Sequence, residues 1–179
     1  MANFQFLAKE DLTLIAGKLA TWMPDMSDWQ SCETSESIEM FTVAIADLQS
    51  AKPASACLQK MNCWQIQVLV SRKPALVARV APIGSDWQVY SVYGEELAIA
   101  MDKALTWIDT NVHDGYIVRM FQIPDYYITG FTFEKGDDVH VYIVNAAPGF
   151  SIDPYTVYAF DDMRKILAPQ PPIHGVGNN

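Results

Sequence analysis

The sequence predicts an α+β fold, in which N-terminal helices are followed by two βββα units that form an antiparallel sheet with the helices packed on one face. Half of the 179 residues are hydrophobic and 18% are charged, which is ample apolar material for a core. Up to about residue 60 the apolar residues recur at helical spacing, and from residue 64 they alternate. Short turns between the alternating segments indicate antiparallel pairing.

The first helix is expected over residues 10–23. Its apolar residues recur about every 3.6 positions, on a face made of Leu12, Ile15, Leu19, Trp22 and Met23. Pro24 ends the helix, because a proline removes a backbone hydrogen bond and clashes with the preceding turn. A polar loop over residues 25–35, which carries Trp29 and Cys32, is expected to follow.

Residues 36–50 are expected to form a second helix. The apolar stripe that predicts it consists of Ile38, Phe41, Ile45 and Leu48. A strand is the alternative there, since residues 41–43 are locally β-prone. A short third helix is expected from Pro53 to Met61, because a proline in the first turn of a helix costs no hydrogen bond.

The remainder of the chain is expected to form the two βββα units. The first comprises strands at residues 64–70, 75–81 and 87–93 and a helix at residues 95–111. The second comprises strands at residues 116–123, 126–134 and 138–145 and a helix at residues 160–167. We expect residues 1–167 to form a single domain and residues 168–179, which are rich in Pro and Gly, to form a flexible tail.

One pattern, G-x-D-x-[QH]-V-Y-x-V, occurs twice, at residues 84–92 and 136–144. Either turns and strands reuse the same residue types, or the two units descend from a duplicated half-domain. The polar and aromatic residues that share one pleat face in the two copies are Gln88, Tyr90, His140 and Tyr142. We expect them to face solvent or a partner, and Val89 and Val141 on the opposite face to contact the helices.

The chain carries no motif typical of a hydrolase, a nucleotide-binding protein, a zinc protease or an EF-hand protein. The strongest candidate for chemistry is the group Asp109, His113 and Asp114, which could share a proton or a metal ion if the helix continues to residue 113. The alternative is that His113 only stabilises the negative end of the helix dipole. The sequence offers no third or fourth ligand nearby, so we expect neither a metal ion nor a cofactor.

Aromatic residues are the remaining clue to function. Five of them lie in expected loops or at strand ends, where the core needs them least: Trp29, Trp87, Tyr93, Tyr126 and Tyr127. Because aromatic residues are enriched at binding hot spots, Trp87, Tyr126 and Tyr127 join the four pleat-face residues as candidate binding residues. Cys57 and Cys63 are expected to be small buried residues, since neither has the setting that activates a thiol.

The formal net charge of −9 argues against nucleic acid or an anionic membrane as a partner, because both require a concentrated basic face. No apolar run approaches the ~20 residues of a membrane span. The chain begins with the approach to an amphipathic helix rather than with a charged-then-apolar signal segment. A cytoplasmic location is the expectation that follows.

These features predict a non-catalytic protein-binding module, either an adaptor, a chaperone-like protein or an immunity-like protein, which acts through an acidic, aromatic-rich surface. The element order resembles the α-βββ-α-ββ-α layout of type III secretion chaperones, which are small, acidic and dimeric, although this chain has an extra strand and a longer helical preface. The alternative is a small-molecule-binding protein or an enzyme, with a pocket between the sheet and the helices and His113 or His140 as acid–base group. A homodimer is also expected, since an open sheet leaves edges to cover.

Overall fold

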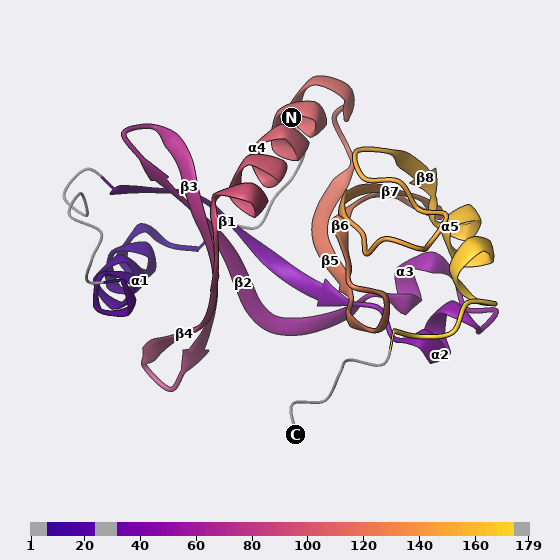
Figure 1. Ribbon diagram of the computed structural model, residues 1–179, viewed down its shortest axis with the longest axis horizontal. Helices are drawn as coiled ribbons and strands as arrows, with labels where there is room; N and C mark the ends of the chain where they lie inside the picture. Colours follow the sequence, from indigo (N-terminus) through magenta and orange to yellow (C-terminus); the bar gives the residue numbers. More distant parts are fainter. Residues whose placement is uncertain (1–6, 24–31, 174–179) are drawn as a thin grey trace. The chain divides into compact units, whose positions relative to one another are not determined.

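The computed structural model describes residues 7–23 and 32–173 (Figure 1). The helices are α1 Lys9–Trp22, α2 Ile45–Leu48, α3 Ala54–Cys57, α4 Glu95–Asn111 and α5 Phe160–Leu167, with a 3-10 turn, η2, at Pro124–Tyr126. The strands are β1 Cys32–Thr42, β2 Gln59–Val70, β3 Lys73–Ile83, β4 Asp86–Tyr93, β5 Ile117–Ile123, β6 Ile128–Lys135, β7 Asp138–Asn145 and β8 Val157–Ala159. The expected mixture of helices with a single large sheet is confirmed.

The sheet has eight strands in the order β4-β3-β2-β1-β5-β6-β7-β8. The pairs β2–β3, β3–β4, β5–β6, β6–β7 and β7–β8 are antiparallel. Two strands therefore form the edges of the sheet, β4 at one end and the short β8 at the other. None of the described helices is both long enough and apolar enough to cross a membrane.

The chain divides into two compact units, each assembled from separate stretches of sequence. Among the described residues, unit 1 comprises residues 41–61 and 106–173, and unit 2 comprises residues 7–23, 32–40 and 62–105. The expectation of a single domain over residues 1–167 stays a prediction. Within unit 1, the Ile173 N–H donates to the Asp125 carbonyl at 2.9 Å, so the first part of the expected tail contacts the fold. Residues 174–179 lie outside the described part.

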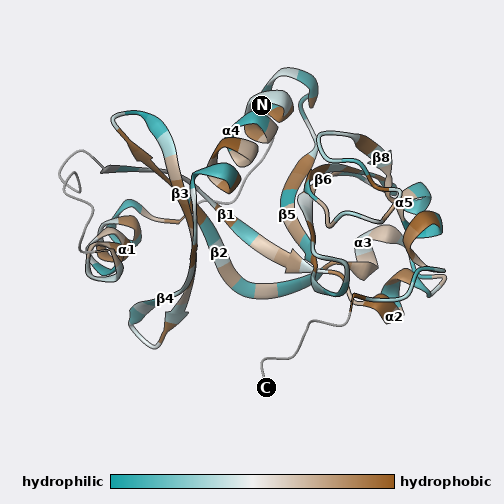
Figure 2. Cartoon of the chain, in the orientation of Figure 1, coloured by the Kyte–Doolittle hydropathy of each residue, from teal (hydrophilic) through white to brown (hydrophobic). Residues whose placement is uncertain are grey.

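In unit 2, one face of β2 packs against α1 and the opposite face packs against α4. Figure 2 shows hydrophobic and hydrophilic residues alternating along β2. Ile66 and Val68 join Ile15 and Leu19 of α1 in one core cluster. The residues between them are glutamines that are 1% and 2% exposed: Gln65 donates to the Met101 sulfur at 3.1 Å, and Gln67 donates to the Ala98 carbonyl at 2.9 Å.

Unit 1 also has side chains packed on both faces of a strand. Val139, Val141 and Ile143 of β7 form a core with residues of α5, namely Phe160, Met163 and Leu167. Tyr142, on the other face, lies 4.9 Å from the Trp107 ring of α4, measured between ring centroids. The expectation that the helices pack on one face is therefore wrong in both units, because helical residues cover the polar or aromatic side of the strand as well as the aliphatic side.

The second expected helix is wrong over most of its length, and the alternative of a strand is confirmed there. Residues 37–40 of β1 are all buried, although two of them, Ser37 and Glu39, are polar. Neighbouring strands on both sides, β2 and β5, favour the extended chain over a helix. Only Ile45–Leu48 of the expected helix is helical, as α2. The third helix, α3, follows Pro53 as expected but ends at Cys57.

The repeated pattern places Gly84 and Gly136 at equivalent positions in two tight hairpins. Both glycines have a φ of 62°, and the flanking pairs Ile83–Asp86 and Lys135–Asp138 close two-residue turns. A positive φ at the first turn residue favours glycine, which explains this part of the pattern. The strands that follow differ in position, because β4 is an edge strand and β7 lies between β6 and β8. Whether the units descend from a duplication stays a prediction.

Candidate functional site: a groove beside the edge strand β4

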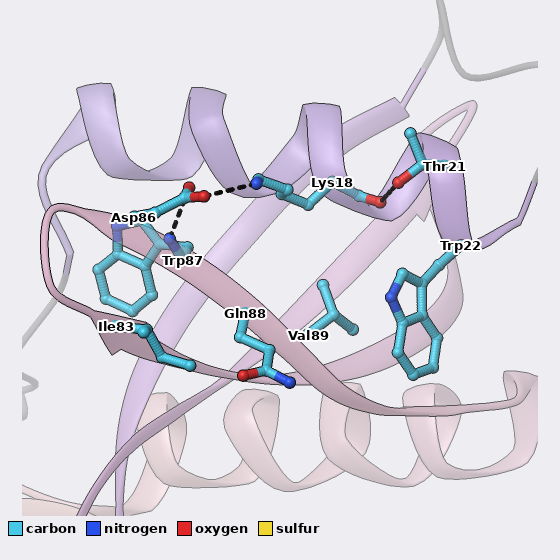
Figure 3. A pocket seen from close by; sticks show the side chains of 8 residues that line it. All are labelled: Lys18, Thr21, Trp22, Ile83, Asp86, Trp87, Gln88 and Val89. Carbon is cyan, nitrogen blue, oxygen red and sulfur yellow. Dashed lines mark hydrogen bonds and ion pairs between the residues drawn. The ribbon is translucent and has the colours of Figure 1, made fainter.

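Two open clefts in unit 2 lie between the C-terminal end of α1 and strand β4, and we call them together the β4 groove. Figure 3 shows the first of them. Their volumes are about 300 and 320 Å³. The residues that line the first cleft include Lys18, Trp22, Ile83, Asp86, Gln88 and Val89. The second cleft is mainly apolar and includes Trp22, Leu76, Val92 and Tyr93. Trp22 therefore lies between the two clefts and lines both.

Trp22 is positioned by the end of α1. Ile15 and Leu19 point from the helix into the core and are fully buried. Trp22 is the last helical residue, and its side chain remains 52% exposed. The Met23 N–H still donates to the Leu19 carbonyl at 3.1 Å, which fixes the backbone of this last turn. The backbone thus holds this large indole in place, and the described residues leave about half of it exposed.

Trp87 anchors α1 to β4 beneath the groove. Its indole N–H donates to the Asp11 carboxylate of α1 at 3.0 Å. Its ring packs edge-on against Trp64, with the ring centroids 5.4 Å apart. These contacts bury Trp87 almost completely, so it is a structural base of the groove rather than the exposed aromatic residue that the sequence suggested.

An ion pair lies at one end of the first cleft. The Lys18 ammonium contacts the Asp86 carboxylate at 2.6 Å, and the Trp87 backbone N–H donates to the same carboxylate at 2.8 Å (Figure 3). The hydrogen bond from Lys18, followed by that from Trp87, lowers the pKa of Asp86 below its usual value. Asp86 is therefore ionised at neutral pH.

The structure brings together part of the site that the sequence predicted. Trp87 and Gln88 line the first cleft, and Tyr90 is exposed on the same strand. Lys18, Trp22 and Ile83 were missed. Trp22 matched the apolar stripe of its helix, so the sequence predicted that its side chain is buried. The structure instead leaves it half exposed at the last turn of α1.

The second copy of the repeated pattern is not an exposed binding face. Tyr142 is 4% exposed because Trp107 covers it, so the expectation that it faces solvent is wrong. His140 is half-buried, and its ring stacks on Phe133 with centroids 5.5 Å apart. Its Nδ1 lies 3.3 Å from the Asp138 carboxylate. These contacts all lie within unit 1.

The two neighbouring tyrosines of unit 1 have opposite environments. Tyr126 is fully buried, and its hydroxyl donates to the carbonyls of Leu167 and Gln170 at 3.2 and 3.0 Å. Tyr127 has a φ of 50° and is 51% exposed. The turn η2 directs Tyr126 inward, so the prediction of an exposed Tyr126 is wrong. Trp29 lies outside the described residues.

The candidate acid–base or metal group, Asp109, His113 and Asp114, lacks the helical spacing on which that candidate depended. Helix α4 ends at Asn111, so His113 is not one helical turn from Asp109, and both side chains are exposed. Asp114 is exposed as well. In the part of the chain that the structure describes, no three His, Cys, Asp or Glu side chains are arranged to hold a metal ion.

Two cysteines, Cys57 and Cys63, are buried, as the sequence suggested. Burial is the main cause that raises the pKa of each thiol. The Cys57 thiol donates weakly to the carbonyls of Pro53 and Asp47, at 3.4 and 3.6 Å. Both thiols are therefore protonated at neutral pH and suited to packing rather than to nucleophilic attack. The side chain of Cys32 lies outside the described part.

The fold defines the protein as an α+β chain with a single, mostly antiparallel sheet and a groove beside one edge strand. Searches among protein-family models, curated proteins and solved structures find no significant match. The function proposed below therefore rests on the residues of the β4 groove.

Proposed function

We propose that this chain is a non-catalytic protein-binding module, of the adaptor, chaperone-like or immunity-like kind, and that its partner docks in the β4 groove. One observation carries the proposal: two large apolar side chains that line this groove, Trp22 and Ile83, are each 52% exposed, and Tyr90 on the same edge strand, β4, is exposed to the same extent. Exposed apolar residues that gather in one place mark interaction surfaces. Trp and Tyr are also the residues most enriched at binding hot spots.

The polar groups of the groove support binding more than catalysis. Asp86 and Lys18 neutralise each other, and Asp86 also accepts a hydrogen bond from the Trp87 backbone. A general acid or base needs a proton that can be exchanged near neutral pH. The lowered pKa of Asp86 makes it a poor candidate for that role.

A small-molecule ligand is the second candidate, and the cleft volumes favour it. Volumes of about 300 and 320 Å³ fall at the lower end of the range for ligand sites, which runs from about 300 to 1,000 Å³. This ligand would occupy the same clefts as the partner. Native mass spectrometry of the protein from its own host separates the two proposals, since a retained ligand adds a small mass and a partner adds a whole polypeptide.

Site-specific photo-crosslinking tests the proposal directly. A photoreactive amino acid replaces Gln88, which is exposed and lines the groove, and a control protein carries it at Tyr127, which is also exposed but lies in unit 1. We expect one discrete polypeptide to be crosslinked in the native host from position 88 and not from position 127. Equal labelling at both positions, or no polypeptide at position 88, contradicts docking in this groove.

A pair of variants of α1 refines the test. Trp22→Ala is expected to lower the crosslinking yield from position 88 at least tenfold, because it removes the aromatic side chain shared by both clefts. Leu14→Ala is the matched control, since Leu14 is on the same helix and is 50% exposed. Both substitutions should leave the unfolding midpoint nearly unchanged, because exposed side chains contribute little to stability. Equal yields from the two variants would refute a role for Trp22.

A further inference from the structure

We infer that the β4 groove binds an extended, basic segment of another protein as an additional strand on β4, with apolar side chains of that segment in the two clefts. The inference rests on the proposed protein-binding function and specifies its partner. Peptides that add a strand to a sheet edge gain affinity from main-chain hydrogen bonds and specificity from pockets for alternate side chains. The groove offers both features.

Strand β4 is an edge with only one of the usual protections, a β-bulge at Tyr90. It has eight residues, whereas β8 at the opposite edge has three. Proteins commonly protect edge strands by shortness, by Pro or by charged residues, especially Lys. Strand β4 contains neither Pro nor Lys, and its only charged residue is Asp86 at the start. Its one irregularity is a bulge at Tyr90, where the register with β3 shifts.

The register with β3 shows which backbone groups are open. In antiparallel pairs, alternate residues direct their N–H groups toward the neighbouring strand. The pairs Ile83–Asp86 and Val80–Val89 then direct the N–H groups of Trp87 and Val89 away from β3. Asp86 already accepts the Trp87 N–H at 2.8 Å. Among the described residues no side chain or loop accepts the Val89 N–H, so a partner strand can pair there.

The two clefts are spaced for alternate side chains of such a strand. Val89 lines the first cleft and Val92 the second. Val89 pairs with Val80 and Val92 with Ala78, because the bulge at Tyr90 takes up one residue of β4. The two positions are therefore about 7 Å apart along the sheet, at about 3.3 Å per residue. Side chains on one face of an added strand recur about every 7 Å. Residues two positions apart in the partner would therefore reach the two clefts.

The charges at the ends of β4 determine the kind of partner. Asp86 begins the strand and forms an ion pair with Lys18. Asp11 of α1 accepts a hydrogen bond from the indole of the next residue, Trp87, and adds a second carboxylate at this end. Beyond the other end, Glu95 and Glu96 are exposed at the start of α4. An extended segment with basic residues at both ends and apolar residues in its centre complements this arrangement.

A second copy of the chain fits this edge poorly. Two β4 strands paired antiparallel would bring Asp86 of each copy close to Glu95 and Glu96 of the other, and like charges on adjacent strands destabilise pairing. The same pairing places the basic ends of a foreign segment beside these acidic residues, where opposite charges attract. A self-paired dimer is therefore the outcome that the test must separate from binding of another protein.

A displayed library of nine-residue peptides provides the probe. The library is selected on the intact protein and counter-selected on Trp22→Ala. We expect the enriched peptides to alternate apolar and polar residues in the centre and to carry Lys or Arg at both ends. Enrichment of acidic ends, or no enrichment relative to Trp22→Ala, overturns the inference.

The best peptide then tests the main-chain hydrogen bonds. It is synthesised with N-methyl groups on alternate backbone nitrogens, in each of the two alternations, and binding is measured by fluorescence anisotropy. Strand addition predicts that one alternation lowers affinity at least tenfold while the other has little effect, and that peptide binding slows exchange of the Val89 amide. Equal binding by both methylated peptides overturns strand addition.

These results are distinguishable from failure of the proposed function. If position 88 crosslinks a partner but methylation of the backbone has no effect, protein binding stands and strand addition falls. If no polypeptide is crosslinked, the function itself falls. If sedimentation shows a dimer that the peptide dissociates, β4 pairs with its own copy and the inference of a foreign basic segment is wrong.

Discussion

Asp47 shows how one buried charge is satisfied in unit 1. Its side chain is nearly inaccessible to solvent, yet the carboxylate accepts hydrogen bonds from the Lys52 ammonium and from the Gln59 amide, each at 2.6 Å. The contact with Gln59 connects α2 to the start of β2. The hydrogen bond from Lys52 is the main cause that lowers the pKa of Asp47 below its usual value.

This environment predicts a pH-dependent contribution to stability. Because the pKa of Asp47 is lower in the folded than in the unfolded protein, the contribution is complete above the unfolded pKa of about 3.9. It decreases as the pH falls through the folded pKa, since the unfolded chain then binds the proton more tightly. Asp47→Asn should therefore lower the urea midpoint at pH 7, and the difference from wild type should shrink toward pH 3.

Urea unfolding at several pH values measures this effect. Asp162→Asn serves as control, because Asp162 forms an exposed ion pair with Lys165 on α5 and should change the midpoint little. A difference between wild type and Asp47→Asn that stays constant from pH 7 to pH 3 would show that the carboxylate charge is not the stabilising feature.

At the scale of elements, the hairpin turns differ in how well their residues suit them. The β3–β4 and β6–β7 hairpins place glycine at the first position, with a φ of 62° in both. The β2–β3 hairpin instead places Ser71 and Arg72 at φ values of 51° and 62°. Two consecutive positive φ values are typical of a type I′ turn, for which Asn-Gly is the preferred sequence.

Replacing Ser71 and Arg72 with Asn and Gly should stabilise the protein. A non-glycine residue in the left-handed region costs about 1–2 kcal/mol, and the gain is partly offset by about 0.5–1 kcal/mol because glycine loses more freedom on folding. We expect Ser71→Asn/Arg72→Gly to raise the free energy of unfolding by about 1 kcal/mol. The opposite change, Gly84→Ala, should lower it by a similar amount. Thermal or urea unfolding that shows no gain for the double variant would contradict this account of the turn.

At the scale of the whole molecule, three elements contribute residues to both compact units. Strand β1 crosses at residues 40–41, β2 at residues 61–62 and α4 at residues 105–106. Local unfolding of one unit would therefore disrupt backbone hydrogen bonds in elements that the other unit needs. Independent domains normally meet at linkers that few contacts cross, and these crossings occur within regular elements.

We predict that the two units unfold in one cooperative transition. Hydrogen exchange at increasing urea should give the same limiting free energy for the most protected amides of β3, in unit 2, and of β6, in unit 1. Two separate limiting values, with one unit exchanging while the other stays protected, would show that they are distinct domains and that the prediction of a single domain is wrong.

The sequence determined the features that depend on near neighbours in the chain. Apolar periodicity predicted α1, α4 and α5, and short turns located the hairpins that precede β4 and β7. The expected strands at residues 64–70, 75–81, 87–93 and 138–145 each lie within an observed strand. At the site, the sequence singled out Gln88 and Tyr90 on β4. These predictions succeed because helix spacing, strand alternation and turn conformation are local properties.

The tertiary structure decided which faces are covered. Gln65 and Gln67 alternate with aliphatic residues and suggest a solvent face, but α4 buries them. Tyr90 and Tyr142 occupy equivalent places in the repeated pattern, yet the first is exposed on an edge strand and the second is covered by Trp107. Strand order and helix placement depend on contacts between residues distant in the chain, and a local pattern does not contain them. The β4 groove arises from such contacts, because it forms where the last turn of α1 meets the edge of the sheet.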